Sequence, residues 1–268
     1  MLEFGISPCP NDIFIFYAIM NQKIDLQGFQ FKFLVEDVEK LNSLCMDKRL
    51  PISKISAHAL FYLQGNYEYL NTGGAISEMG PVVVAKDKNK IENSKNLRVI
   101  LPGRLTTASA LMWFYWKENF LGKSYILDYV TFNEIIEKLM TEQGDMGVLI
   151  HEGRFVYESY GLKLIADLGE FWKIKTHLPI PLGCIVVKKD LKLKEKLETL
   201  IKNSIQYAYE NFEEVMPFVK KYAQELDDNV IISHIKTYVN EFSLELGCKG
   251  RESIEALIKE IKEVGIWK

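Results

Sequence analysis

Short apolar runs alternate with segments of helical periodicity through the first two thirds of the chain. Apolar residues three and four positions apart predict helices at Ile13–Met20, Asp37–Asp47, Ala57–Gln64, Ala108–Asn119 and Asn133–Thr141. The short runs predict eight β-strands, at Leu2–Ile6, Phe29–Val35, Ile52–Ser56, Gly80–Ala85, Leu97–Leu101, Ile126–Thr131, Met146–Ile150 and Cys184–Lys188. This alternation is typical of an α/β fold with largely parallel sheets.

The pattern changes near Leu193, and from there to the end of the sequence it is almost entirely helical. Apolar residues on one helical face predict four helices in this tail, at Lys194–Asn211, Val215–Glu225, Asn229–Glu241 and Glu252–Val264. No internal repeat, low-complexity tract or Gly/Ser-rich linker divides the chain. The fold class that we expect is therefore α/β with a helical C-terminal tail.

Two segments that break the pattern are candidate boundaries between lobes. They are the charged segment Lys86–Lys95 and the proline-containing segment Leu178–Leu182, and each lies beside an apolar strand run. Two such crossings suit a fold in which the chain leaves a first lobe and later returns to it. We expect one lobe from residues 1–85 plus 184–268 and a second from 86–183, with a ligand cleft between them at the carboxyl ends of the strands.

Composition narrows the classes of protein that the chain can belong to. Its 268 residues are enough to bury a substantial core, and the formal net charge is −3. That charge, with Lys and Arg spread evenly, argues against a nucleic-acid partner. No apolar segment reaches the length of a membrane span, and the first residues lack the features of a secretory signal. We therefore expect a cytoplasmic protein with no membrane partner.

The four cysteines support the same expectation. They are far apart and lack metal-ligand spacing, so reduced thiols are the simplest interpretation: Cys9, Cys45, Cys184 and Cys248. The histidines also lack the spacing of metal ligands, so no metal site is expected. Nothing near Cys9 in the sequence offers it a base, which favours a packed thiol over a nucleophile.

The segment Ser7 to Asp12 links the first predicted strand to the first predicted helix. Its two prolines remove backbone donors, so neither element can run through it. Asn11 or Asp12 is expected to cap the helix. The resulting corner presents unpaired N–H groups outward, which is a natural seat for an anionic ligand, although a plain capped helix start explains the same pattern.

His151 is the outstanding candidate for chemistry. It directly follows the predicted strand Met146–Ile150, at the rim where α/β proteins form their sites. Imidazole is well suited to accept and return a proton near neutral pH. On position alone, a structural histidine is an equal alternative. Glu152 can orient the ring or face solvent. His58 is interpreted as structural or peripheral, and His177 and His234 as scaffold.

Other polar residues close predicted strands or open predicted helices. Alternation places Lys54 and Ser56 on the same side of one strand, offering a cation and a hydroxyl together, although a solvated surface charge is the plainer interpretation of Lys54. One of Thr106 and Thr107 can cap the helix that begins near residue 108, and the amides that need capping can also bind a carboxylate. Arg104 adds a fork-shaped partner for a carboxylate.

These motifs together resemble the 1,4-dihydroxy-6-naphthoate synthase family of the futalosine route to menaquinone. The resemblance rests on an ordered set of segments. They are Ser7-Pro8-Cys9-Pro10-Asn11-Asp12, Glu36-Asp37-Val38-Glu39, Lys54-Ile55-Ser56, Gly73-Gly74-Ala75, Gly80 to Ala85, Pro102-Gly103-Arg104, Thr106-Thr107-Ala108, Ile150-His151-Glu152, Leu178 to Gly183 and Thr237 to Ser243.

The resemblance implies a two-lobed type II periplasmic-binding-protein fold, used by a cytosolic lyase that needs no cofactor. The implied substrate is a small carboxylate, cyclic dehypoxanthinyl futalosine. The implied chemistry is removal of a carbon-bound proton, expulsion of a ribose-derived fragment and aromatisation to the naphthoate. His151 matches the family's proposed proton acceptor. Substrate contacts are carried over to Lys54, Ile55, Ser56, Thr107 and Ala108, with Asn11, Thr106 and Arg104 as further candidates.

Two alternatives stay open at the level of sequence. One is chorismate dehydratase, a sister enzyme of the same fold and pathway, which the opening segment and the His151 segment disfavour. The other is a non-catalytic protein that binds a small molecule on the same fold. Tyr207 and Tyr209 in the tail are compatible with a homodimer, and ordinary packing explains them equally well.

Overall fold

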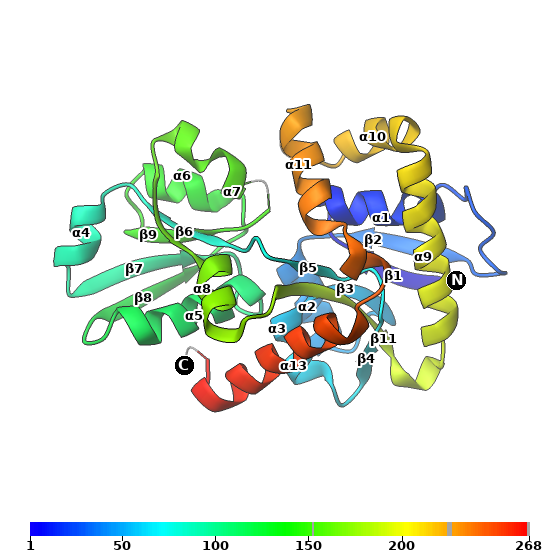
Figure 1. Ribbon diagram of the computed structural model, residues 1–268, viewed down its shortest axis with the longest axis horizontal. Coiled ribbons are helices and arrows are strands. Elements are labelled where there is room, and N and C mark those ends of the chain that lie inside the picture. Colours follow the sequence, from blue (N-terminus) through cyan, green and yellow to red (C-terminus); the bar gives the residue numbers. More distant parts are fainter. Residues whose placement is uncertain (152, 224–226, 267–268) are drawn as a thin grey trace.

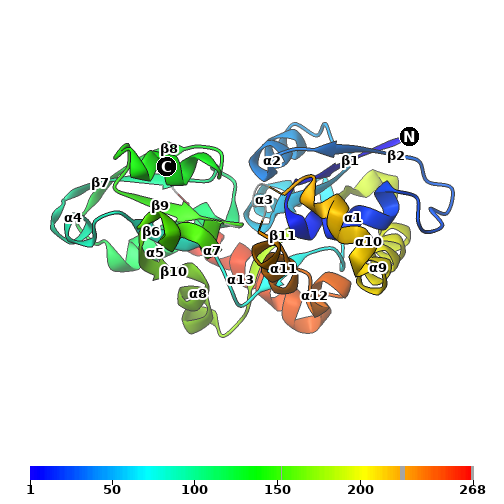
Figure 2. The same ribbon diagram turned by 90° about the horizontal axis from the view of Figure 1, so that it is seen from above.

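Two mixed β-sheets organise the chain, and they lie side by side in the computed structural model (Figures 1 and 2). The structure describes residues 1–151, 153–223 and 227–266. The first sheet has the strand order β2-β1-β3-β11-β4, with β5 paired to β11. Its strands are β1 Leu2–Ile6, β2 Phe31–Val35, β3 Ile52–Ser56, β4 Tyr67–Tyr69, β5 Ala75–Ser77 and β11 Ile180–Lys188.

The second sheet has the order β10-β6-β9-β7-β8. Its strands are β6 Val82–Ala85, β7 Asn96–Leu101, β8 Ser124–Tyr129, β9 Met146–Leu149 and β10 Lys163–Asp167. Helices accompany both sheets: α1 Pro10–Met20, α2 Val38–Met46, α3 Ala57–Leu63, α4 Lys88–Asn93, α5 Thr107–Asn119, α6 Glu134–Met140, α7 Gly153–Val156, α8 Leu168–Thr176, α9 Lys194–Glu210, α10 Phe212–Lys220, α11 Asp228–Tyr238, α12 Glu241–Leu244 and α13 Gly247–Val264.

The expectation of largely parallel sheets is wrong, because the strands that connect the two halves run against their neighbours. Within the first sheet β1 pairs in parallel with β2 and β3, whereas β11 is antiparallel to β3, β4 and β5. In the second sheet β7 is parallel to β8 and β9, whereas β6 is antiparallel to β9 and β10. The direction of a strand that enters or leaves a lobe is determined by the path of the chain between the two sheets. The local sequence pattern does not indicate this direction.

Strand pairing also moves both predicted lobe boundaries. β6 belongs to the second sheet, so the division after residue 85 lies one strand too late. The whole of β11 belongs to the first sheet, so a boundary between 183 and 184 would cut through a strand. We propose that the chain crosses between lobes at residues 78–81 and 177–179, where the strands of one sheet end and those of the other begin.

The helix α1 shows why the predicted tail folds back onto the N-terminal half. Ile13, Phe14, Ile15 and Phe16 are all fully buried, although they succeed one another along the helix. A helix that is apolar all round must be covered on every side. The first sheet covers one side of α1, and α9, α10 and α11 of the tail cover the rest (Figure 1).

The last helix lies beneath the junction of the two sheets (Figure 1). α13 begins at Gly247, five residues before the predicted start. It packs against α3 and β11 of the first half, while Leu257 and Ile261 join the hydrophobic core of the second sheet. A single helix thus contributes to the cores on both sides of the junction. Within the described residues, no helix combines the length and the apolarity that crossing a bilayer requires.

Candidate active site

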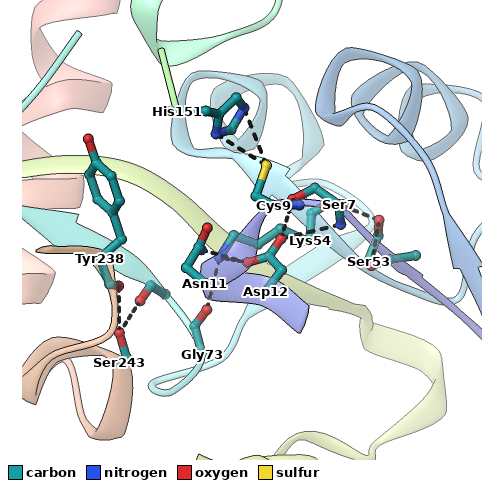
Figure 3. Close-up of polar contacts among 12 residues, drawn as sticks. Ser7, Cys9, Asn11, Asp12, Ser53, Lys54, Gly73, His151, Tyr238 and Ser243 are labelled. Carbon is teal, nitrogen blue, oxygen red and sulfur yellow. Dashed lines mark hydrogen bonds and ion pairs between the residues drawn. The ribbon is translucent and has the colours of Figure 1, made fainter. Parts of the chain in front are cut away.

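The first corner of the chain forms the floor of the site (Figure 3). β1 ends at Ile6 and α1 begins at Pro10, so Cys9, and neither Asn11 nor Asp12, occupies the N-cap position. The expected capping role is therefore wrong. Asp12 lies in the first turn and reaches back instead, accepting hydrogen bonds from the Ser7 amide at 3.3 Å and the Ser7 hydroxyl at 2.7 Å. Its carboxylate holds the corner closed.

A buried ion pair joins this corner to β3. The Lys54 ammonium lies 2.9 Å from the Asp12 carboxylate, and the two side chains are 6% and 1% exposed. Lys54 also donates to the Gly73 carbonyl at 3.1 Å. Charges taken this far out of water persist only when they are paired and hydrogen-bonded. The ammonium is thus engaged by the protein, and it is neither the solvated surface charge nor the uncommitted cation that the sequence suggested.

His151 lies above this floor at the end of β9 (Figure 3). Its φ of 52° places it in the left-handed region, which is uncommon for a residue with a side chain. The ring makes an edge contact with Phe132 at a centroid distance of 4.6 Å. Burial disfavours the charged imidazole and lowers the pKa of His151 from 6.5 to about 4. The ring is therefore neutral near pH 7 and able to accept a proton.

The partner of His151 is the cysteine that the sequence left without a base. Cys9 Sγ lies 3.2 Å from His151 Nδ1 and 3.5 Å from Nε2, although 142 positions separate the two residues along the chain. Cys9 itself is 3% exposed. Cys9 is packed, as expected, but a distant segment supplies the base that its sequence neighbours do not. The thiol contacts the imidazole and helps to fix the ring over the corner.

A second wall comes from the start of α5. Thr106 is the N-cap of this helix, and its hydroxyl accepts from the Ser109 amide at 3.3 Å. Thr107 is the first helical residue, and its hydroxyl donates to the Leu182 carbonyl at 2.9 Å. The amides of Thr107 and Ala108 lie in the first turn of α5, where the helix has no preceding carbonyl to accept from them, so they have no partner within the helix. Such amides are suited to bind a carboxylate.

Ser56 closes the same wall at the end of β3. Its hydroxyl accepts from Asn42 Nδ2 at 3.1 Å, and its amide donates to Asn42 Oδ1 at 2.9 Å. A hydroxyl that accepts one hydrogen bond still has a proton to donate. The hydroxyl of Ser56 therefore has a proton to offer a ligand. The hydroxyl of Thr107 does not, because its proton is donated to the Leu182 carbonyl, while its oxygen accepts from the His58 amide at 3.1 Å.

These features face one cavity with an empty volume of about 650 Å³, which includes space open to solvent. It brings together all the predicted site residues except one: Asn11, Lys54, Ile55, Ser56, Thr106, Thr107, Ala108 and His151. The exception is Arg104, which lines a separate hollow with Glu39 and Tyr129. The turn at Gly103, with φ of 98°, leads Leu105 N onto the Glu39 carboxylate at 2.9 Å, so the chain at Arg104 faces that hollow.

Other residues of the cavity were missed or misassigned from the sequence. Ser7, Asp12 and Tyr238 also line it, and so does His234, which was expected to be scaffold. His234 and Tyr238 come from α11, whose helical periodicity marks a buried face but says nothing about which distant segment that face meets. The sequence offered a signal for three of them, because Ser7 and Asp12 belong to the first corner and Tyr238 lies in the segment Thr237 to Ser243, and both segments carry the family resemblance. Glu152 lies outside the described residues.

His58 lies behind the wall, outside the residues that line the cavity. It is 1% exposed, and its Nδ1 is 3.1 Å from the Thr106 carbonyl. Burial lowers the pKa of His58 from 6.5 to about 4. The side chain therefore supports the start of α5 in its neutral form.

We expect this depressed pKa to make the free energy of unfolding depend on pH. Between pH 6.5 and about 4 the unfolded chain binds a proton at His58 that the folded protein does not, so stability falls as the pH is lowered through this window. The contribution is about 1.4 kcal/mol per pH unit. Urea denaturation at several pH values gives the free energy of unfolding as a function of pH. We expect its slope to be shallower in His58→Gln than in the natural sequence, by the amount that corresponds to about one bound proton. Equal slopes in the two proteins would contradict the assignment.

Among the described residues, no group of three or more His, Cys, Asp or Glu side chains is placed to hold a metal ion. The titratable groups that line the cavity are instead the Lys54–Asp12 ion pair, the imidazoles of His151 and His234 and the phenol of Tyr238. A neutral base, a donor hydroxyl and helix amides in one cavity are suited to bind an anionic substrate and to move a proton on it.

Comparison with known proteins gives a consistent answer over the whole chain. The profile of a protein family described as "Menaquinone biosynthesis" matches residues 2–263. A 1,4-dihydroxy-6-naphtoate synthase of Thermus thermophilus is 37% identical over 268 residues, covering 99% of this chain and 95% of the relative. The synthase of Streptomyces coelicolor is 31% identical, covering 99% of this chain and 94% of the relative.

Solved structures agree on the fold. A protein of Archaeoglobus fulgidus superposes with a TM-score of 0.90 at 29% identity, covering 98% of this chain and 97% of its own. The periplasmic aliphatic sulphonate-binding protein SsuA of Escherichia coli superposes with a TM-score of 0.67 at 10% identity, covering 100% and 92%. The second likeness is one of fold alone. It confirms the two-sheet, periplasmic-binding-protein-like architecture expected from the sequence.

Proposed function

The chain belongs to the menaquinone biosynthesis family, and from this premise we propose that it forms 1,4-dihydroxy-6-naphthoate. The observation that carries the proposal is identity above 30% to two such synthases over 99% of the chain. The finer part of the proposal is the reaction class, a carbon–carbon lyase acting on cyclic dehypoxanthinyl futalosine, a small carboxylate. The cavity supports it by combining a neutral base with anion-binding amides.

In the proposed mechanism His151 is the general base. Its neutral ring accepts a proton from a carbon of the substrate, and the electron pair of that C–H bond enters the forming aromatic ring. The bond to the ribose-derived fragment breaks in compensation, and the fragment leaves with its bonding electrons and takes up a proton. Formation of the aromatic ring drives the reaction, and electrons balance without a redox partner, so we propose that no cofactor takes part.

The rest of the cavity positions the substrate. The amides of Thr107 and Ala108 bind its carboxylate, and the Ser56 hydroxyl donates to one of its oxygens. Lys54 affects the substrate only indirectly, because its ammonium is bound by the Asp12 carboxylate. We further propose a cytoplasmic location, in which the four cysteines remain thiols, as all four are in the structure. The homodimer stays a prediction.

The direct test is to incubate the purified protein with cyclic dehypoxanthinyl futalosine and follow the absorbance of the naphthoate. We expect product to form without added metal or cofactor. Chorismate is the matched control substrate, since its dehydration would indicate the sister enzyme of the pathway. Binding of the futalosine derivative without its consumption would favour a binding protein and contradict the proposal.

A further inference from the structure

A chain of hydrogen bonds leads from the buried ion pair to a second histidine of the cavity. Asn11 Nδ2 donates to Asp12 Oδ1 at 2.9 Å, and Asn11 Oδ1 lies 2.9 Å from His234 Nε2. His234 is 0% exposed, and it lines the same cavity as His151. The two imidazole rings face each other with centroids 6.1 Å apart and planes inclined by 28°.

The ion pair determines which way the Asn11 amide points. Asp12 is bound to the Lys54 ammonium at 2.9 Å, and an ionised carboxylate only accepts hydrogen bonds. The NH₂ group of Asn11 must therefore face Asp12, and its carbonyl oxygen must face His234. The usual ambiguity between the oxygen and nitrogen of an amide is removed by the charge beside it.

The orientation of Asn11 then determines the tautomer of His234. A carbonyl oxygen can only accept, so His234 Nε2 must carry the proton of the hydrogen bond. Complete burial lowers the pKa of His234 well below 6.5, and the ring is neutral. In a neutral ring protonated at Nε2, Nδ1 is an acceptor with a free lone pair. Within the described part of the chain, His234 Nδ1 is buried and has no hydrogen-bond partner.

We propose that His234 Nδ1 binds a hydroxyl of the substrate, as a fixed acceptor beside the proton-accepting His151. The inference rests on the proposed function, which supplies a substrate with a sugar-derived, hydroxyl-bearing part. A buried acceptor without a partner is costly, and a ligand donor in the cavity would satisfy it. The 6.1 Å between the rings lets one small molecule meet both of them.

His58 shows that an unpartnered ring nitrogen alone does not make a site. Its Nε2 is also buried and without a partner, but His58 is not among the residues that line the cavity. The argument for His234 combines the lone pair, the cavity and the second imidazole. The chain of hydrogen bonds also gives Asn11 a role, since Asn11 positions His234 and does not itself need to contact the substrate.

Two substitutions separate binding by Nδ1 from support by Nε2. The amide of Asn reaches the place of an imidazole Nδ1, so His234→Asn keeps an acceptor toward the cavity and loses the bond to Asn11. The longer Gln reaches the place of Nε2, so His234→Gln keeps the bond to Asn11 and loses the acceptor. We expect kcat/KM to fall roughly 10-fold or more in His234→Gln and about 3-fold or less in His234→Asn.

The outcomes of this comparison are decisive in both directions. A larger loss of kcat/KM in His234→Asn than in His234→Gln would assign His234 a structural role through Asn11. If both variants were as active as the natural sequence, His234 would have no role in the site. Either result overturns the proposal. His177→Asn is the matched control, because His177 is exposed and lies outside the cavity. Its kinetic constants should be unchanged.

A second measurement needs no activity. The ¹⁵N chemical shifts of the imidazole nitrogens distinguish the two neutral tautomers, and through-bond correlation with the assigned backbone resonances identifies the signals of His234. We expect a proton on Nε2 and a bare Nδ1 in the ligand-free protein. A proton on Nδ1 would overturn the proposal even if both variants failed to fold. Failure of the natural sequence to form naphthoate would contradict the proposed function instead, and would leave this tautomer test standing.

Discussion

His151→Gln is expected to lower the turnover of cyclic dehypoxanthinyl futalosine by two to four orders of magnitude, in the range typical of losing a general base. The neutral ring is the group that accepts the proton, and an amide cannot replace it. The fold should tolerate the change, since Gln22 and Gln27 of this chain already adopt the left-handed conformation found at His151. We therefore expect the free energy of unfolding to change by less than about 1 kcal/mol.

Cys9→Ala is the matched control for this loss. Cys9 contacts the imidazole at 3.2 Å but has no proposed bond to the substrate. Removing the thiol should loosen the ring and cost about 10-fold or less, the size of one ordinary hydrogen bond. Steady-state rates of naphthoate formation measure both variants. A loss in Cys9→Ala as large as that in His151→Gln would point to a nucleophilic thiol, and near-normal turnover in His151→Gln would refute the role of the base.

Asp12→Ala is expected to destabilise the protein by roughly 3–5 kcal/mol, because it leaves the buried Lys54 ammonium without its counter-charge. The same change removes the acceptor of the Ser7 hydroxyl and of the Asn11 amide. Urea denaturation followed by circular dichroism measures the effect. A loss below 1 kcal/mol would show that water or another group compensates the ammonium and that the ion pair is not needed for the corner.

Lys54→Met in the Asp12→Ala background tests whether the unpaired charge is the cause. Removing both charges abolishes the penalty for burying one of them alone. The double variant should therefore be more stable than Asp12→Ala, in spite of carrying one more substitution. A double variant that is less stable by the sum of the two single effects would instead indicate independent packing losses.

Several predicted elements agree with the observed ones for a local reason, although the short strands β4, β5 and β10 were not predicted. The first strand was predicted at Leu2–Ile6 and lies there, and the predicted helix Ala108–Asn119 begins one residue earlier, at Thr107. Proline positions, capping hydroxyls and hydrophobic periodicity act over one turn or one strand, so they can be read from neighbours in the sequence. The end of β9 at Leu149, with His151 just beyond it, was accessible for the same reason.

The direction of the crossing strands and the state of the charges had no such local signature. β11 runs antiparallel to β3 because the chain returns from the second sheet, which is a property of topology. Lys54 has the sequence context of a surface lysine, yet burial against Asp12 makes it part of the floor. Desolvation depends on what covers a group, and distant segments supply that cover.

The sequence by itself therefore determined the α/β class, the helical tail, the strand-to-helix corner and the histidine at the end of a strand, since each depends on contacts within a few residues. Only the tertiary structure decided that Cys9 meets His151, that Arg104 turns away from the cavity and that His234 enters it. Those contacts join residues far apart along the chain, and packing of the two sheets and the tail around one cavity selects them. Ion pairing, tautomer and pKa follow from that packing, because the energy of a charge or a lone pair is set by the atoms around it in space.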